Sequence, residues 1–294
     1  MTSSQARPVA VIGATGQQGS SAIDALLASG VPVRAVVRDP GSAAARALVA
    51  RQVEVVAGDQ EDGASLASGL ADVASLFFMT TFAGPDGTEG EVRRGRTVAE
   101  AAARAGVPRV VYSSVGGAER GTGIPHFESK RRVEERLADL VAATFLRPTF
   151  FMENLAPQLV PDAAGDVVVR LPLGPEVPLQ MVAVRDIGVA AARLLVDPEA
   201  VEGDAVEIAG DELTLTQVAD RVGHASGRPA RFEQVPLEAL GDDADLKAMF
   251  RWFATVPAYE ADLAATRRLV PDVRDLSSWL AARPHPEAGE AAAR

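Results

Sequence analysis

Three glycines near the start of the chain, Gly13, Gly16 and Gly19, have a spacing that could serve chemistry. They follow an apolar run at residues 9–12 and precede an amphipathic stretch. The first glycine permits a sharp turn off a strand, the second lets the backbone approach a phosphate, and the third lets the next helix pack closely on the sheet. The start of that helix would offer free N–H groups and a positive dipole end to an anion. A tight turn without a ligand is the alternative. We expect the loop to hold the pyrophosphate of a dinucleotide through Gly13, Thr15, Gly16, Gln17, Gln18 and Gly19.

His126 and Lys130 form a second pair whose spacing could serve chemistry. On a helix over residues 126–141 they share a face with the aliphatic Val133 and Leu137. A lysine on that face needs a partner, because an unpaired buried charge is costly, and the ribose hydroxyls or phosphate of a nucleotide would supply one. The alternative is a lysine whose stem lies on the core while its ammonium reaches water. For His126, proton donation competes with a plain polar residue at the start of the helix.

The elements that must position these groups alternate between strand-like and helix-like segments. Apolar strand patterns and amphipathic helix patterns follow one another through the first half of the chain, and this rhythm is typical of an α/β fold with a doubly wound parallel sheet of the Rossmann type. The strands are expected at 9–12, 33–37, 53–57, 73–79, 109–113 and 144–146, and the helices at 20–30, 41–50, 64–70, 89–105 and 126–141.

The residue that follows the second strand indicates which dinucleotide binds. In this fold an acidic side chain there accepts from the 2′-hydroxyl of NAD, whereas an arginine suits the 2′-phosphate of NADP. Arg38 comes directly after the strand and offers a planar fork matched to a phosphate, while Asp39 precedes Pro40 and suits a turn. An ordinary surface arginine is the alternative. The sequence favours NADP(H) over NAD(H).

Polar residues follow three further strands at the edge where ligands lie in open parallel sheets. Asp59, with Gln60 beside it, is placed to accept from the adenine amino group, and a helix cap is an equally good interpretation of Asp59. The remaining candidates at this edge are Thr80, Thr81, Phe82 and Ser113.

Beyond residue 153 the pattern changes, and we expect two domains. The NADP(H)-binding Rossmann domain comprises residues 1–153 and about 181–197, with a strand at 182–184 and a helix at 186–196 returning to the main sheet. A smaller α/β unit for a substrate or partner comprises 154–180 and 198–282, including a strand at 205–208. Residues 283–294 have the composition of a disordered tail.

Composition excludes several classes of function. The 29 basic residues face 40 acidic ones, a net charge of −11, which disfavours direct binding to nucleic acid. The chain has no cysteine, and its three histidines lack the spacing of metal ligands, so we expect no metal site. No signal peptide or long apolar run is present, so we expect a cytoplasmic protein that does not enter the membrane. A homodimer is a further candidate for the assembly, although the sequence does not indicate the oligomeric state.

Several segments together resemble the NmrA-like family, an atypical branch of the short-chain dehydrogenase/reductase superfamily, and are closest to its NADPH-sensor type. The segments are residues 13–19, 36–40, 78–82, 126–130, 151–155 and 249–253. The resemblance implies an NADP(H) site with Arg38 near the 2′-phosphate and Lys130 on the nicotinamide ribose. It also implies a basic residue near the cofactor at Arg96, and closure over the nicotinamide end by Phe151, Glu153 and Asn154.

One departure from the superfamily pattern bears on function. Active members pair a tyrosine with a lysine four residues later, but His126 stands at that position, and Tyr112 and Tyr259 do not replace the missing donor in sequence. The absence favours a redox sensor whose conformation or partners change with NADP(H). The alternative is an NADPH-dependent reductase of a small carbonyl, quinone or enone, with Lys130 and His126 as catalytic residues. Sugar-nucleotide epimerisation is less favoured, because it also needs a base at this position.

Overall fold

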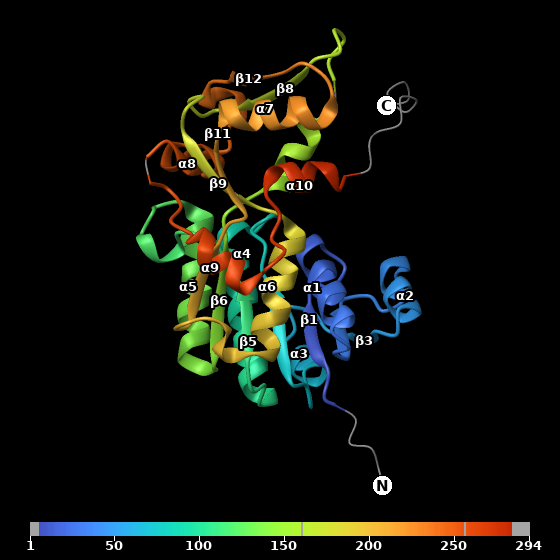
Figure 1. Cartoon of the computed structure of the whole chain (residues 1–294). Coiled ribbons are helices and arrows are strands. Elements are labelled where there is room, and N and C mark those ends of the chain that lie inside the picture. Colours follow the sequence, from blue (N-terminus) through green and yellow to red (C-terminus); the bar gives the residue numbers. More distant parts are fainter. Residues whose placement is uncertain (1–5, 160, 256, 284–294) are drawn as a thin grey trace.

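A seven-stranded parallel sheet lies at the centre of the computed structural model, which describes residues 6–159, 161–255 and 257–283 (Figure 1). Its strand order is β10-β6-β5-β4-β1-β2-β3, and every neighbouring pair runs parallel. This arrangement confirms the predicted Rossmann-type α/β class. The strands are β1 (Val9–Ile12), β2 (Val33–Val37), β3 (Glu54–Ala57), β4 (Ser75–Met79), β5 (Val110–Ser113), β6 (Ala143–Pro148) and β10 (Ala205–Ile208).

Helices cover both faces of this sheet, which explains why its central strands are continuously apolar. One face packs on α1 (Gln17–Ala28), α2 (Ala43–Ala50) and α6 (Val184–Val196). The other packs on α3 (Gly63–Gly69), α4 (Gly87–Ala105) and α5 (Pro125–Leu140). The strands and helices predicted up to residue 146 are therefore present, with ends that differ by a few residues.

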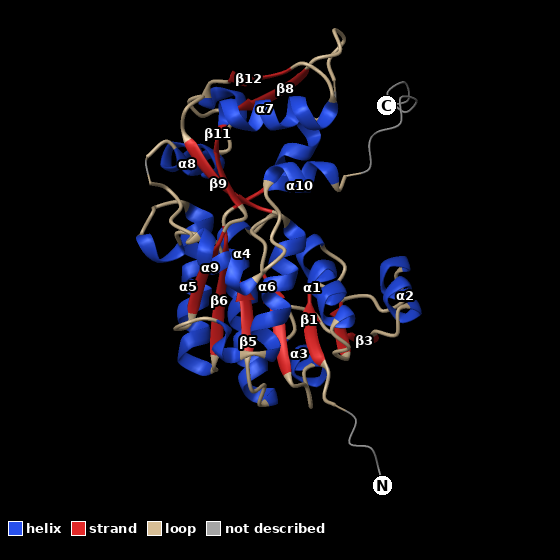
Figure 2. Cartoon of the chain, in the orientation of Figure 1, coloured by secondary structure: helices blue, strands red, loops and turns tan. Residues whose placement is uncertain are grey.

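A third apolar cluster, which includes Val169, Leu213 and Trp279, lies beyond the carboxyl edge of the main sheet. Figure 2 shows two small sheets and several helices at that end of the molecule. Within the described part of the chain, none of the helices has the length and apolar character needed to span a membrane. The elements here are β7 (Phe150–Phe151), β8 (Val167–Leu171), β9 (Pro178–Val182), β11 (Asp211–Thr214), β12 (Ala230–Gln234), α7 (Leu215–Ser226), α8 (Ala244–Phe253), α9 (Leu263–Leu269) and α10 (Leu276–Ala281).

Two predicted strand placements are wrong. The strand expected at 182–184 to return to the main sheet is β9, which ends at Val182 and pairs with β7 and β11 in a three-stranded sheet; only α6 returns to the main core. The strand at 205–208, expected in the smaller unit, instead pairs with β6 and forms the edge of the main sheet. A short apolar run carries no information about its partner strand, which explains both errors. The division into two domains stays a prediction, and residues 284–294 of the predicted tail lie outside the described residues.

Helices α1 and α6 pack closely against each other on one face of the main sheet. Gly188 of α6 faces the α1 backbone so closely that a Cβ there would lie 2.4 Å from the carbonyl carbon of Ser21 and 2.6 Å from the amide nitrogen of Ala22. Backbone atoms cannot move aside as a flexible side chain can, so α6 tolerates only glycine at this crossing.

We predict that Gly188→Ala destabilises the protein by about 1–3 kcal/mol, because the added methyl group forces the two helices apart. Gly223→Ala on α7 is the matched control: its Cβ would meet nothing closer than 3.4 Å, and removing a helical glycine should stabilise the protein by about 0.5–1 kcal/mol. Chemical denaturation of both variants measures the difference. Equal stability of the two would contradict this account of the helix crossing.

Candidate functional site: a nucleotide-shaped cleft

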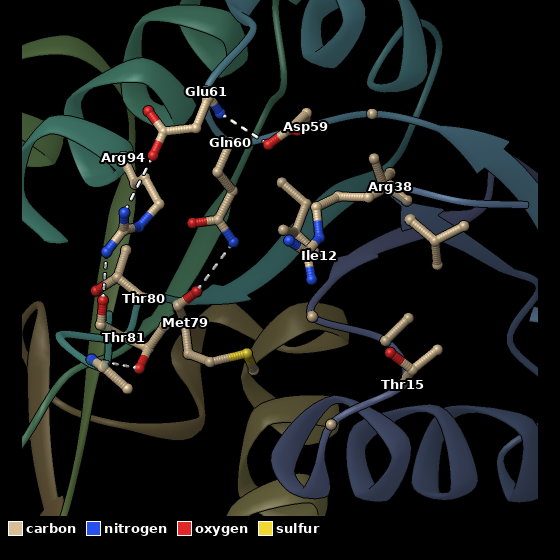
Figure 3. A pocket seen from close by; sticks show the side chains of 17 residues that line it. Ile12, Thr15, Arg38, Asp59, Gln60, Glu61, Met79, Thr80, Thr81 and Arg94 are labelled. Carbon is tan, nitrogen blue, oxygen red and sulfur yellow. Dashed lines mark hydrogen bonds and ion pairs between the residues drawn. The ribbon is translucent and has the colours of Figure 1, made fainter. Parts of the chain in front are cut away.

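A cleft of about 550 Å³ opens at the carboxyl edge of the main sheet, between the glycine loop and the ends of β2, β3 and β4 (Figure 3). Residues predicted from the sequence supply part of its lining: Gly13, Thr15, Gly16, Arg38, Asp59, Gln60, Thr80 and Thr81. Sequence reasoning missed the rest: Ile12, Ala14, Val36, Val37, Gly58, Glu61, Met79, Ala83 and Arg94.

The three glycines of the loop have distinct structural roles. Gly13 has φ +78°, and Gly19 approaches it so closely that a Cβ on Gly19 would lie 2.1 Å from the Gly13 carbonyl oxygen. At Gly16 the nearest atom would be 3.4 Å away, so this position is held open towards the cleft rather than packed. Gly16 is also the N-cap of α1 and has no side chain to bond the first N–H groups of the helix. Those groups and the helix dipole suit an anion.

Arg38 provides positive charge on one wall of the cleft. It follows β2 directly, is exposed, and extends its guanidinium into the cleft, as Figure 3 shows. Asp39 stabilises the following turn instead, because its Oδ1 accepts from the backbone N–H of Gly41 at 2.8 Å. The predicted turn at Asp39 and the predicted position of Arg38 are both observed.

A second arginine, Arg94 of α4, lies on the opposite wall (Figure 3). Its guanidinium donates to Glu61 Oε1 at 3.0 Å and to the carbonyl of Thr81 at 2.7 Å. The sequence reasoning selected Arg96 instead. Arg96 lies about 200° further round α4, and it lines a separate charged groove with Arg132 of α5. The basic residue of α4 that reaches the cleft is therefore Arg94.

Asp59 and Gln60 both line the far end of the cleft. Asp59 Oδ1 accepts from the Glu61 N–H at 3.0 Å, whereas Asp62 caps α3 through the N–H groups of Ala64 and Ser65. The cap that was an open alternative for Asp59 thus belongs to Asp62. Gln60 donates to the Met79 carbonyl at 3.5 Å, and its buried Oε1 has no hydrogen-bond partner among the described residues. In Figure 3 this oxygen points toward Arg94, whose Nε is likewise buried without a partner among the described residues.

Lys130 has a protein partner that the sequence reasoning did not identify. Its Nζ lies 2.6 Å from Glu91 Oε1 and donates to the Thr80 carbonyl at 3.3 Å. Glu91 is fully buried on α4 and also accepts from the hydroxyls of Thr80 and Ser129. A nucleotide is therefore not needed to balance the Lys130 charge, which corrects that part of the prediction.

Tyr112 is excluded as a replacement proton donor. It lies on β5, is fully buried, and its hydroxyl is 2.7 Å from the Thr80 hydroxyl. Burial, together with the nearby Glu91 charge, raises the pKa of Tyr112 well above its ordinary value. Its hydroxyl belongs to the network beneath the cleft.

His126 is held at the first turn of α5 by a residue of α8. Asp245 accepts from the His126 backbone N–H at 3.1 Å and lies 2.6 Å from Nδ1, and the imidazole stacks on Phe82 with ring centroids 4.7 Å apart. Burial lowers the pKa of His126, and the neighbouring Lys130 charge adds to that effect, although Asp245 opposes it. A neutral imidazole at neutral pH is poorly suited to the proton-donor role predicted for it.

The remaining predicted residues lie near the cleft or beyond it. Gln17 and Gln18 form the first turn of α1, and Gln18 Oε1 accepts from the Ser113 hydroxyl at 2.6 Å. Phe151 packs partly buried against the core beneath α1 and α6, and Asn154 is exposed. Glu153 is already engaged, because its carboxylate accepts from the Val184 N–H at 3.1 Å and from Trp279 Nε1 at 2.9 Å. These two contacts hold Glu153 in place, and its contact with the cofactor stays a prediction.

The chain is similar to several known proteins. The NAD(P)H azoreductase of Xenophilus azovorans is 32% identical over 237 residues, covering 78% of this chain and 78% of that protein. The nitrogen metabolite repression protein nmrA of Emericella nidulans is 27% identical over 248 residues, covering 79% and 69%. The NADPH-dependent quinone oxidoreductase QOR2 of Escherichia coli, solved with NADPH, has a TM-score of 0.77 at 25% identity over 92% of this chain and 98% of that one. A model of the NmrA-like family matches residues 5–280, and the chain belongs to that family.

Proposed function

We propose that the chain binds NADP(H) in the cleft. The observation that carries this proposal is the position of Arg38. Its side chain extends into a cleft whose lining includes Gly13 and Gly16 of the glycine loop. The residues fit the cofactor: Gly16 leaves room for the pyrophosphate, the N–H groups of α1 face it, and the Asp59 carboxylate in the cleft lining suits the adenine amino group. The quinone oxidoreductase solved with NADPH adds support through its similarity over nearly the whole chain.

Two basic residues would contact the two ends of the cofactor. Arg38 binds the 2′-phosphate through its planar fork. Lys130 donates to the ribose at the nicotinamide end, beside Thr80. When bound, NADPH supplies a hydride, with its electron pair, to an acceptor and leaves as NADP⁺.

The class of acceptor follows from the groups around that end. The Tyr112 hydroxyl is fully buried and bonded to Thr80, and burial lowers the pKa of His126, so neither side chain is well suited to donate a proton to the reduced product. A conjugated, electron-poor acceptor such as a quinone or an azo compound tolerates this, because its reduced anion is delocalised and takes its proton from water. We therefore propose an NADPH-dependent reductase of such acceptors, a proposal also supported by the azoreductase and quinone oxidoreductase relatives.

A redox sensor is the second candidate function. The same lack of a proton donor favours it, and so does the tie between His126 at the cleft edge and Asp245 of α8, which links the site to the surface of the C-terminal helices. In this case NADP(H) binding would alter that link and thereby a protein partner's affinity. The cytoplasmic location and the homodimer stay predictions.

We predict that Arg38→Ala weakens NADPH binding about tenfold to hundredfold, because it removes charge-assisted hydrogen bonds to the 2′-phosphate. NADH, which lacks that phosphate, should bind with nearly unchanged affinity. Titration calorimetry with both cofactors gives the comparison. Arg96→Ala is the matched control and should leave both affinities unaltered; a loss there that equals the loss in Arg38→Ala would point to general electrostatics rather than a phosphate site.

Turnover distinguishes the two candidate functions. With quinones and azo compounds as acceptors, we expect loss of the near-ultraviolet absorbance of NADPH, and we expect Tyr112→Phe to retain the rate within about twofold, because its hydroxyl is not a donor in the reaction. Binding of NADPH without any turnover across such a panel would reject the reductase and leave the sensor. A large fall in rate for a stably folded Tyr112→Phe would show that the assigned role of Tyr112 is wrong.

A further inference from the structure

Among the described residues of the site, Glu91 is the only fully buried carboxylate. It accepts hydrogen bonds from three side chains of the site. Its Oε1 accepts from Lys130 Nζ at 2.6 Å and from Thr80 Oγ1 at 2.9 Å. Its Oε2 accepts from the Ser129 hydroxyl. One side chain of α4 therefore joins the end of β4 to α5 directly beneath the cleft.

Burial of this carboxylate is unfavourable by itself. Burial alone would raise the pKa of Glu91, but the Lys130 charge and the three hydrogen bonds outweigh it, and the pKa lies below its ordinary value. Glu91 is therefore ionised at neutral pH, and its charge fixes where the Lys130 ammonium lies. The Lys130 side chain is only 12% exposed, so its ammonium has little freedom to move elsewhere.

Two of the three N–H groups of the Lys130 ammonium have protein partners, which leaves the third for a ligand. An ammonium carries three hydrogens. Among the described residues, Nζ donates to Glu91 and to the Thr80 carbonyl, and Thr80 itself lines the cleft. The third N–H of Nζ has no partner among these residues, and Nζ lies one hydrogen bond away from Thr80 of the cleft lining.

We propose that Glu91 is a positioning residue of the cofactor site: it holds Lys130 against the end of β4 so that the third N–H of Lys130 meets the cofactor ribose. This proposal rests on the proposed binding of NADP(H). If Glu91 merely joined α4 to α5, its replacement would lower the stability of the protein and leave the affinity for the cofactor unchanged. If Glu91 positions Lys130, its replacement also lowers the affinity for the cofactor, and this effect depends on the presence of Lys130.

NADPH affinity of the full chain, measured by titration calorimetry, tests the proposal with Glu91→Gln, which keeps the size and an acceptor oxygen but removes the charge. We expect about a tenfold loss of affinity, comparable to one charge-assisted hydrogen bond. Adding Lys130→Met to Glu91→Gln should lower the affinity for NADPH by less than about a further twofold, because Lys130 is no longer positioned once the Glu91 charge is removed. Glu134→Gln is the control: it breaks the buried pair with Arg147, away from the cleft, and should lower stability without changing affinity.

Unchanged affinity in Glu91→Gln, with the full loss appearing only when Lys130 is also replaced, would overturn the proposal. Should Glu91→Gln fail to fold, Ser129→Ala retains the charge and removes one hydrogen bond to it; we expect about a twofold to threefold loss of affinity, and a folded variant with wild-type affinity would also overturn the proposal. Absence of NADPH binding by the wild-type chain is a different result, which rejects the proposed function itself.

Discussion

The ion pair between Glu91 and Lys130 is the contact on which the arrangement of the candidate site depends. Each charge is unfavourable in the core without the other, so the pair holds α4, α5 and the end of β4 in one relative position. Thr80 bonds both to Glu91 and to Tyr112 of β5, which extends the same restraint to the neighbouring strand. We infer that these contacts order this wall of the cleft before a ligand binds, and a preorganised donor loses less entropy on binding.

The other half of the cleft depends on close backbone packing rather than on charge. Gly19 lies against Gly13, and Gly188 of α6 lies against α1, so α1 is fixed from both sides. Its N-terminus consequently points at the opening left by Gly16. Charge at one end and glycine packing at the other together define a binding site suited to an elongated anionic ligand.

Much of this could be predicted from the sequence because the relevant patterns are local. The glycine spacing, the strand that ends before Arg38 and the amphipathic helix that carries Lys130 each depend on residues close together in the chain. Relations between distant segments could not be predicted in the same way. The errors at 182–184 and 205–208 concerned which strand pairs with which, and Asp245 reaches His126 across 119 positions.

Glu91 was missed for an additional reason. It shares a helical face with Gly95, Val98 and Ala102, all of which are buried, and a carboxylate on such a face signals an internal partner. The same periodicity would have separated Arg94 from Arg96, had the orientation of α4 towards the cleft been known.

The most direct test of the proposed site is a crystal structure of the complex with NADPH. We predict that the 2′-phosphate lies on Arg38, that the pyrophosphate lies over Gly16, and that the nicotinamide ribose lies within hydrogen-bond distance of Lys130 while Lys130 still contacts Glu91. A cofactor bound elsewhere, or one whose ribose lies out of reach of Lys130, would contradict it.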